Sequence, residues 1–468
     1  MINLFTRRRG RKPHYWSAVA LVSAVAVSGL LFALTGSAGA VKRHVAAADD
    51  FLTATYMPIK LRAAGDPAEV RFDISCLPPG GDAEGPGVCD GGGTVYFRAG
   101  TTVASVPLQL DPDAQVGRYV AAVPPAIWNA QLFTYYAVLR DNSTGRTIVL
   151  PHGGSSAPQI SLAMNGPSVD LGTHAFGATR AATARIAEAS WGVGDGQVGL
   201  EDGIDMPAGG SSFDVDSSGA VYLMDEANSR LLKFGGGSVQ AIPLPGLAGV
   251  RADLRVSDST GTAYVLETAS ASSSSPVLRS FTLQGVPLGS SAVADAAAAQ
   301  VRLSGSTAYV SEYPSSVWAP VLQNNGRAPV DASAQGANAL SGAPTTDGNV
   351  FVLSTGNEIR VGTTSTGGSR FSTVRITSAT PVADIQLAQK LPNGRLLVVF
   401  SVYTDTDHEY QALVLDPSGA VADQFSLPAA EWAQSMPLSR FRVVGSSLYE
   451  LGSTDTGVFV DRYDLGVS

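Results

Sequence analysis

The residues of this sequence whose types and spacing could do chemistry are carboxylates. Asp405, Asp407 and Glu409 alternate along the segment TDTDHEY, and oxygen donors on one loop are the ligands that Ca²⁺ prefers. The competing interpretation, which we favour, is a solvated turn between two strands. His408 is the only histidine after residue 184, so we expect no metal site and no active site built on several histidines in this region.

Other catalytic motifs are missing from the sequence. The chain after residue 184 has no cysteine, and no GxSxG elbow occurs in a strand-to-helix context. There is also no P-loop and no dinucleotide fingerprint. We therefore leave the enzyme question open and favour a function without catalysis and without a cofactor.

The two cysteines, Cys76 and Cys89, are separated by twelve residues rich in Gly and Pro. In an exported chain such a pair is typical of a local disulfide, which by loop entropy would stabilise the fold by roughly 3 kcal/mol. The spacing is too wide for a CxxC motif and no histidine lies near, which disfavours a redox or metal pair.

The charge is divided unevenly along the chain. The formal net charge is −9, but residues 1–43 hold seven cations and no acid, which leaves 24 cations against 40 acids in the remainder. An acidic body lacks the basic face that nucleic acids require, so we expect no nucleic-acid partner. The same charge keeps an exported protein soluble.

The N-terminus carries an export signal. Residues 1–14 are basic, and Tyr15–Ala40 has no charge over 26 residues, which exceeds the about 20 that span a bilayer as a helix. The basic flank predicts a cytoplasmic tail with the bulk of the chain outside the cell. Ala38–Ala40 has the small-x-small form of a cleavage site. We favour an uncleaved, single-pass signal-anchor in the cell membrane over a cleaved signal peptide, because the apolar run is long.

Residues 44–165 predict a β-sandwich of about seven short strands. The segment YYAVLRDNSTGRTIVL resembles the closing hairpin of immunoglobulin-like and fibronectin-III-like modules, which implies an immunoglobulin-like domain. Cys76 and Cys89 would then share one inter-strand loop. Residues 152–183 are rich in Gly, Ser, Pro and Ala, and residues 166–183 of this stretch are predicted to be a linker.

The remainder, residues 184–468, repeats one unit, whose clearest copy is the strand–turn–strand–turn–strand segment Phe213–Phe234. Its second strand recurs as VYLMD, AYVLE, AYVSE, VFVLS, LLVVF and LYELG, with successive spacings of 42, 45, 42, 46 and 52 residues. This period predicts a six-bladed β-propeller. Its last repeat has only three strands, so we predict that Arg185–Ala189 adds the outer strand, antiparallel to Val458–Asp464.

The first copy, VYLMDEANSRLLKF, resembles an NHL repeat through Asp225, Asn228, Arg230 and Leu231. The resemblance implies that these residues fix a turn and a contact between blades. Glu267 in the second copy and Glu312 in the third replace the Asp, so the match to the NHL repeat is good for one blade only. Propellers of this kind host hydrolases, lyase-like enzymes and binding platforms, so the fold leaves the function open.

First strands of blades line a propeller's channel, and Asp214, Asp253 and Asp384 lie near them. Six-bladed lactonases hold a catalytic Ca²⁺ with channel acids, so a Ca²⁺-dependent, lactonase-like hydrolase is the runner-up. Trp318 is predicted to lie on a loop after the third repeat's second strand, where it could be a ligand anchor on one face; packing between blades is the interpretation we favour.

The sequence therefore predicts an all-β protein: a β-sandwich followed by a six-bladed β-propeller, behind one N-terminal transmembrane helix. The favoured function is extracytoplasmic binding, with a protein or glycan ligand at the propeller and the membrane as partner of the N-terminal helix. A purely structural role for both modules in a surface assembly is a third interpretation.

Overall fold

The computed structural model describes residues 52–76, 90–111, 117–202, 207–248, 251–268, 275–294, 298–312, 317–368, 370–430, 432 and 438–466. Strands dominate these ranges, which confirms the all-β class; the helices among them are the short α2 (Pro125–Trp128) and α3 (Ala332–Ala337). No helix of the described ranges is long and apolar enough to cross a membrane. The predicted anchor and Cys89 lie outside the described residues, so the membrane span and the disulfide stay predictions.

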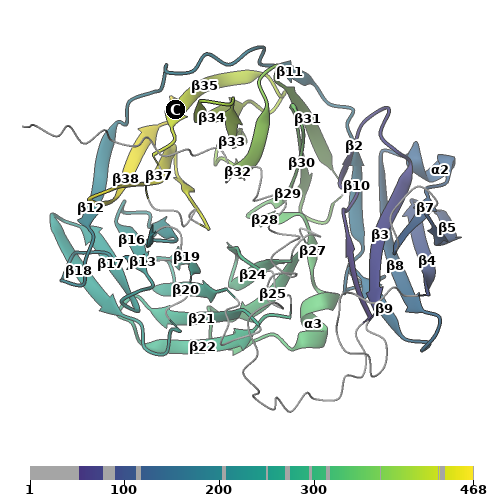
Figure 1. Ribbon diagram of the computed structural model, residues 1–468, viewed down its shortest axis with the longest axis horizontal. Helices are drawn as coiled ribbons and strands as arrows, with labels where there is room; N and C mark the ends of the chain where they lie inside the picture. Colours follow the sequence, from purple (N-terminus) through teal and green to yellow (C-terminus); the bar gives the residue numbers. More distant parts are fainter. Residues whose placement is uncertain are drawn as a thin grey trace, which may run out of the picture.

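Two bodies lie side by side in Figure 1: a pair of packed sheets and a ring of sheets. The pair consists of one sheet in the order β1-β3-β7-β6 and a second in the order β2-β10-β8-β4-β5, with β9 also paired to β8. All pairings are antiparallel except that of β10 with β2. The strands are β1 (Leu52–Tyr56), β2 (Leu61–Arg62), β3 (Glu69–Cys76), β4 (Gly91–Ala99), β5 (Thr102–Pro107), β6 (Gln109–Leu110), β7 (Arg118–Ala122), β8 (Leu132–Asp141), β9 (Thr147–Leu150) and β10 (Gln159–Ala163).

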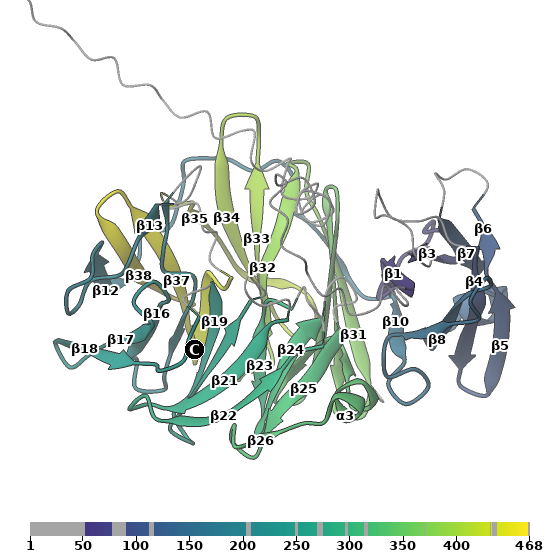
Figure 2. The same ribbon diagram turned by 60° about the horizontal axis from the view of Figure 1, so that its bottom comes forward.

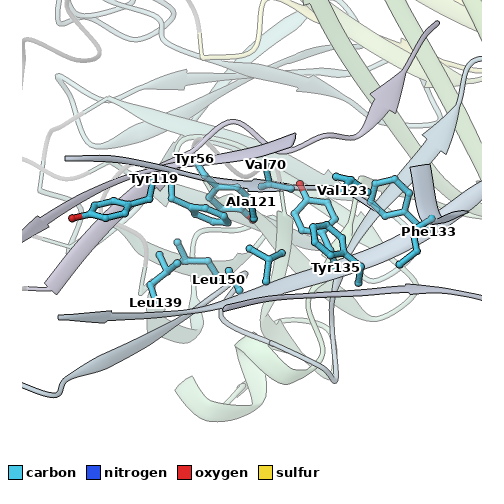
Figure 3. Close-up of a cluster of buried hydrophobic side chains, with 14 of the residues drawn as sticks. Tyr56, Val70, Tyr119, Ala121, Val123, Phe133, Tyr135, Leu139 and Leu150 are labelled. Atoms are coloured by element: carbon cyan, nitrogen blue, oxygen red, sulfur yellow. The ribbon is translucent and has the colours of Figure 1, made fainter. Parts of the chain in front are cut away.

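The core of this sandwich follows from strict alternation. Along β8 every second side chain is buried, beginning with Phe133 and Tyr135, because successive side chains of a strand point to opposite faces. These rings pack against the facing sheet (Figure 3), and the Ile59 N–H donates a 2.8 Å hydrogen bond to the buried hydroxyl of Tyr135. The sandwich therefore has a complete apolar core of its own.

The second body is a ring of six sheets, numbered one to six here in chain order (Figure 1). Sheets one and two contain β15 (Phe213–Val215), β16 (Val221–Asp225), β17 (Arg230–Gly235), β18 (Ser238–Pro243), β19 (Ala252–Ser257), β20 (Thr262–Glu267), β21 (Val277–Thr282) and β22 (Pro287–Ala292). Sheet three contains β23 (Val301–Ser304), β24 (Thr307–Glu312), β25 (Val317–Gln323), β26 (Ala328–Pro329) and β27 (Leu340–Ser341). A separate short hairpin, β13 (Glu201–Asp202) and β14 (Pro207–Ala208), precedes sheet one.

Sheet four contains β28 (Ala343–Thr345), β29 (Gly348–Thr355), β30 (Glu358–Ser365), β31 (Phe371–Thr377) and β11 (Ser168–Asp170). Sheets five and six contain β32 (Val382–Lys390), β33 (Leu396–Tyr403), β34 (His408–Leu415), β35 (Val421–Pro428), β36 (Phe441–Val444), β37 (Ser447–Thr454), β38 (Gly457–Asp464) and β12 (Ala184–Ser190). Each predicted repeat strand is the second strand of one sheet. The inner strands of sheets one and six touch, as do those of sheets one, two and three, so the body is a β-propeller.

The NHL-like residues fix a turn, as predicted. Asp225 accepts hydrogen bonds from Asn228 Nδ2 at 2.9 Å and from Arg230 Nε at 2.7 Å across the turn between β16 and β17. Arg230 also donates to the carbonyls of Gly194 and Gln197, both at 2.8 Å. These residues thereby hold the loop that leads from β12 into sheet one.

Residues 166–190, which we call the strap, run along the outer rim of sheets four, five and six (Figure 1). β11 pairs in parallel with β31, Thr179 forms a parallel bridge with Ser426 of β35, and β12 pairs antiparallel with β38. The strap begins at Gly166. Only glycine fits at this position, because a Cβ there would lie 1.6 Å from the carbonyl oxygen of Thr373. Most of the predicted linker is therefore bound to the propeller surface.

The predicted closing strand is confirmed. Arg185 lies opposite Asp461 and Ala189 opposite Val458, with an irregularity at Ile186 where the register shifts. Arg185 Nε and Asp461 Oδ1 form an ion pair at 2.9 Å. The outer edge of sheet six is thus covered by a strand from the start of the propeller sequence.

The sandwich is docked on the ring where sheets three and four meet. Shared clusters of buried apolar side chains join sheets one to two, two to three, four to five, five to six and six to one, and none of the described clusters joins three to four. Phe351 of sheet four packs instead on Leu61 and Leu162 of the sandwich. Arg360 reaches the carbonyl of Leu61 at 3.0 Å and pairs with Asp66. The sandwich therefore covers the joint that has the least apolar packing of its own (Figure 2).

Candidate functional site

The channel of the propeller is lined by the first strand of each sheet, and one edge of such a strand has no ladder partner. Its N–H groups must be satisfied in another way. Asp214 accepts a 2.7 Å hydrogen bond from Val256 N, and Asp253 accepts a 2.8 Å hydrogen bond from Val301 N. Ser212 Oγ donates to Asp253 at 2.8 Å. The acids on β15 and β19 therefore connect the inner strand of one sheet to that of a neighbouring sheet.

Arg442 of β36 lies buried beside both acids. It donates 2.9 Å hydrogen bonds to Asp253 Oδ1 and to the carbonyls of Leu254 and Phe213. Its Nε lies 3.6 Å from Asp214 Oδ1. Burial lowers the pKa of Arg442, and the nearby charge of another arginine lowers this pKa further. One guanidinium thus ties sheets six, one and two together at the inner rim.

The structure brings together two of the three predicted channel acids. Asp214 and Asp253 meet at Arg442, whereas Asp384 is exposed on β32, and its backbone N–H binds Ser401 Oγ at 3.0 Å. Although the residue is exposed as a whole, partial desolvation of its carboxyl raises the pKa of Asp384. Among the described residues, no group of three or more His, Cys, Asp or Glu could hold a metal ion. The described acids do not form the ligand set expected of a lactonase-like centre.

The acids of the predicted Ca²⁺ loop are also separated. Asp405 and Asp407 are exposed in the turn between β33 and β34, where Thr406 Oγ1 donates a 2.6 Å hydrogen bond to Asp407. Glu409 is buried and binds the strap, with its Oε2 2.8 Å from His174 Nε2. The favoured interpretation, a solvated turn, describes Asp405 and Asp407 correctly and fails for Glu409.

Trp318 is not on a loop. It lies on β25, 4% exposed, and the guanidinium carbon of Arg302 stands 5.4 Å from its ring centroid. Its ring is therefore a packing surface inside the propeller and cannot act as an anchor on an open face.

A cavity of about 340 Å³, partly open to solvent, lies under the strap between sheets four and five. Backbone and side chains of the strap form one wall, the end of β31, β34 and β35 form the others, and most lining groups are polar. The lining residues are Leu171, Gly172, Thr173, His174, Ala175, Ala178, Ser378, Gln411, Gln424, Phe425 and Ser426.

The strap is held over this cavity by Glu409. Its carboxylate accepts a hydrogen bond from the Gly177 N–H at 2.7 Å and faces His174 at 2.8 Å. Gly177 has a φ of +89°, a conformation that favours glycine. The glycine at this position therefore permits the turn that directs its N–H toward Glu409. The backbone N–H of His174 also donates a 2.8 Å hydrogen bond to Thr380 Oγ1. The one acid and the one imidazole at the cavity are thus engaged with each other.

Gln411 is the polar group of the cavity that stands out. Its side chain is 4% exposed and lines the cavity, and its amide makes no hydrogen bond to the described part of the chain. The amide carries two donors and one acceptor. Such a group is available to a ligand without breaking an existing contact.

Sequence reasoning missed Gln411, His174 and the channel arginines. A signal existed for Gln411, since a lone amide inside the apolar run of β34 breaks the expected pattern for a buried strand. Arg442 between Phe441 and Val443 is the same kind of exception. No such signal marks His174, because its partner Glu409 is brought to it only by the path of the strap.

No family model matches the chain, and no curated protein matches it. Similar solved structures include virginiamycin B lyase from Staphylococcus aureus, at 9% identity and a TM-score of 0.32, over 54% of this chain and 94% of that chain. A luciferin-regenerating enzyme matches at 9% identity and 0.33, over 55% and 92%. A quinonprotein alcohol dehydrogenase-like protein from Bacteroides thetaiotaomicron matches at 11% and 0.23, over 79% and 94%. Values this low carry no argument about function, and the ring of sheets itself identifies this part of the chain as a β-propeller.

Proposed function

We propose that this is an extracytoplasmic binding protein whose propeller holds a small, uncharged, polar ligand in the cavity under the strap. The observation that carries the proposal is the buried Gln411 amide, which lines the cavity without a partner. The amide faces the cavity, where a ligand that both donates and accepts hydrogen bonds can replace the water that would otherwise satisfy it, and each such hydrogen bond contributes about 0.5–1.5 kcal/mol.

The chemistry of the walls supports a sugar unit of a glycan as the ligand class. Thr173, Ser378 and Ser426 line the cavity together with Gln411, and the Glu409 carboxylate is already bound by the Gly177 N–H and the His174 ring. A neutral ligand therefore leaves no charge unbalanced. A cavity of about 340 Å³ is in the usual range for small-molecule sites, and a single sugar ring fits it.

The proposed setting is the outer face of the cell membrane, with residues 15–40 as the anchor. We propose further that the six sheets are the blades of a six-bladed, NHL-like propeller and that the sandwich is immunoglobulin-like. β9 and β10 pair with successive parts of β8 and count together as one strand, G; lettered in chain order, the sheets then run A-B-E-D and A′-G-F-C-C′, which is the immunoglobulin order and supports this assignment. Protease treatment of intact cells tests the setting: residues after Arg43 should be cleaved from outside.

Calorimetric titration of the purified full chain with a panel of neutral monosaccharides and short glycans tests the binding function. In Gln411→Met, which keeps the side-chain volume, we expect binding to be lost and the melting temperature without ligand to hold or rise. Gln240→Met, an exposed position on β18, is the matched control and should bind like the parent. Equal affinities of the Gln411→Met and Gln240→Met variants would refute the site, and no binding by the parent would refute the ligand class.

A further inference from the structure

Three arginines from three different inner strands face the propeller channel. Arg255 comes from β19, Arg302 from β23 and Arg442 from β36. The carboxylates that meet them are Asp214 and Asp253. The described cluster therefore has one more positive than negative charge.

The two carboxylates do not satisfy all three guanidinium groups. Asp253 is bound by Arg442 at 2.9 Å, and Asp214 lies 3.4 Å from Arg255 Nη1 and 3.6 Å from Arg442 Nε. Arg255 Nε is buried and has no hydrogen-bond partner in the described part of the chain. This N–H is an unused donor next to a shared acid.

Arg302 has even fewer partners. Of the five N–H donors that a guanidinium carries, one makes a 3.3 Å hydrogen bond, to the carbonyl of Ala388 across the channel. No described carboxylate forms an ion pair with Arg302, and its guanidinium lies over the ring of Trp318. Burial lowers the pKa of Arg302 to about 9, and the charges of Arg255 and Arg442 lower it as well.

From these unused donors we propose that the channel binds one small oxyanion between Arg255 and Arg302. A buried positive charge without a counter-ion is costly, and an anion at this point would balance the cluster. Guanidinium groups present paired N–H donors that match carboxylate, phosphate and sulfate oxygens. Arg442 is a positioning residue here, because its donors are already committed to Asp253 and two carbonyls.

The site is independent of the cavity under the strap. Arg255 and Arg302 are on the inner strands of sheets two and three, whereas Gln411 is on sheet five beside the outer rim. A channel variant should therefore leave glycan binding unchanged. Failure of one proposal does not imply failure of the other.

The experiment titrates the full chain with inorganic phosphate at constant ionic strength, with sulfate and acetate in parallel, and follows binding by calorimetry and by the ³¹P line width. We expect saturable binding of one ion, weakened about tenfold or more in Arg302→Met and in Arg255→Gln. Arg370→Gln, an exposed position on sheet four, is the control and should bind like the parent. Phenyl phosphate identifies the source of the group: binding equal to phosphate indicates an anion carried on a larger molecule, and weaker binding indicates a free ion.

A response to phosphate that does not saturate, or that is equal in Arg302→Met and Arg370→Gln, would show an adventitious ion only and overturn the proposal. If Arg302→Met fails to fold, Arg255→Gln decides, since Arg255 is partly exposed and its Nε has no contact to lose. In that variant, phosphate affinity equal to that of the parent would also overturn it.

Discussion

The two halves of the propeller are held together in different ways. Sheets one to three are joined at the inner rim by buried acids and serines, and Arg442 extends this connection to sheet six. Sheets four to six are bound at the outer rim by the strap. Both devices satisfy strand edges that would otherwise lack partners, the first with side chains and the second with added backbone. The connection at the inner rim depends on buried charges, which are destabilising when they lose a partner. The connection at the outer rim depends on backbone hydrogen bonds between the strap and the outer strands.

The largest effect should come from breaking the outer device at the closing strand. Ala187→Pro with Ala189→Pro places two prolines at buried positions of β12 and should cost up to about 6 kcal/mol, or abolish folding, because each proline lacks a ladder N–H and each buried acceptor left without a partner costs about 1–3 kcal/mol. Denaturant unfolding measures the change. The same double substitution at Ser238 and Gln240 of β18, an exposed outer strand that closes no other sheet, is the control and should cost clearly less.

Breaking the inner device should have the second largest effect. Arg442→Met leaves Asp253 buried with a charge that has lost its ion-pair partner, and removing one partner of a buried pair costs about 3–5 kcal/mol. Chemical denaturation of the full chain gives the number. Arg327→Met, at an exposed position, should change the free energy of unfolding little. Equal losses in the two variants would mean that the inner rim does not depend on Arg442.

The stability of the propeller should depend on pH through Glu226, which lies in the half joined at the inner rim. Burial raises the pKa of Glu226 from 4.5 to about 7, and its Oε2 accepts a 3.3 Å hydrogen bond from Ser211 N. A carboxyl with a raised folded-state pKa stabilises the fold fully below pH 4.5, and this stability is lost as the pH rises to about 7. The loss should be about 3 kcal/mol at most.

Glu226→Gln tests this expectation, because an amide keeps the acceptor for Ser211 and removes the titration. The variant should be more stable than the parent at pH 8 and similar to it at pH 4. Unfolding free energies measured across this range show the difference. A parent and variant with parallel pH profiles would place the titration elsewhere.

The smallest effect should come from a surface contact of the strap. Arg180 pairs with Asp423 at 3.0 Å and stacks on Phe425, but its side chain is 34% exposed, so Arg180→Met should cost about 1 kcal/mol or less. Hydrogen exchange should rise locally at Thr179–Thr183 while the rest of the ring keeps its protection. Faster exchange throughout sheets one to three would contradict the separation of the two halves.

Local patterns predicted the elements that depend on them. The strands of each sheet alternate or are apolar throughout, and the missing fourth strand of the last repeat led to Arg185–Ala189. The strap was predicted as a linker because its Gly, Ser, Pro and Ala residues have no periodicity and its partners lie about two hundred residues away. The cavity could not be foreseen for the same reason, since Gln411 and His174 meet only through that path. The channel acids were located correctly, but their spacing contains no information about which arginines neutralise them.

The closing strand also sets an order of events during synthesis. Apart from β11, β12 is made before every other strand of sheets one to six, and its partner β38 is made after all the others. The sandwich, with its own core, can form while the chain emerges, but the ring cannot close until β38 is present. If the chain is exported, as proposed, the strap has no partner for β12 until almost the whole propeller has been translocated. Its Ala-rich, weakly β-forming composition suits this delay, since a strongly β-forming strand left without its partner would favour aggregation.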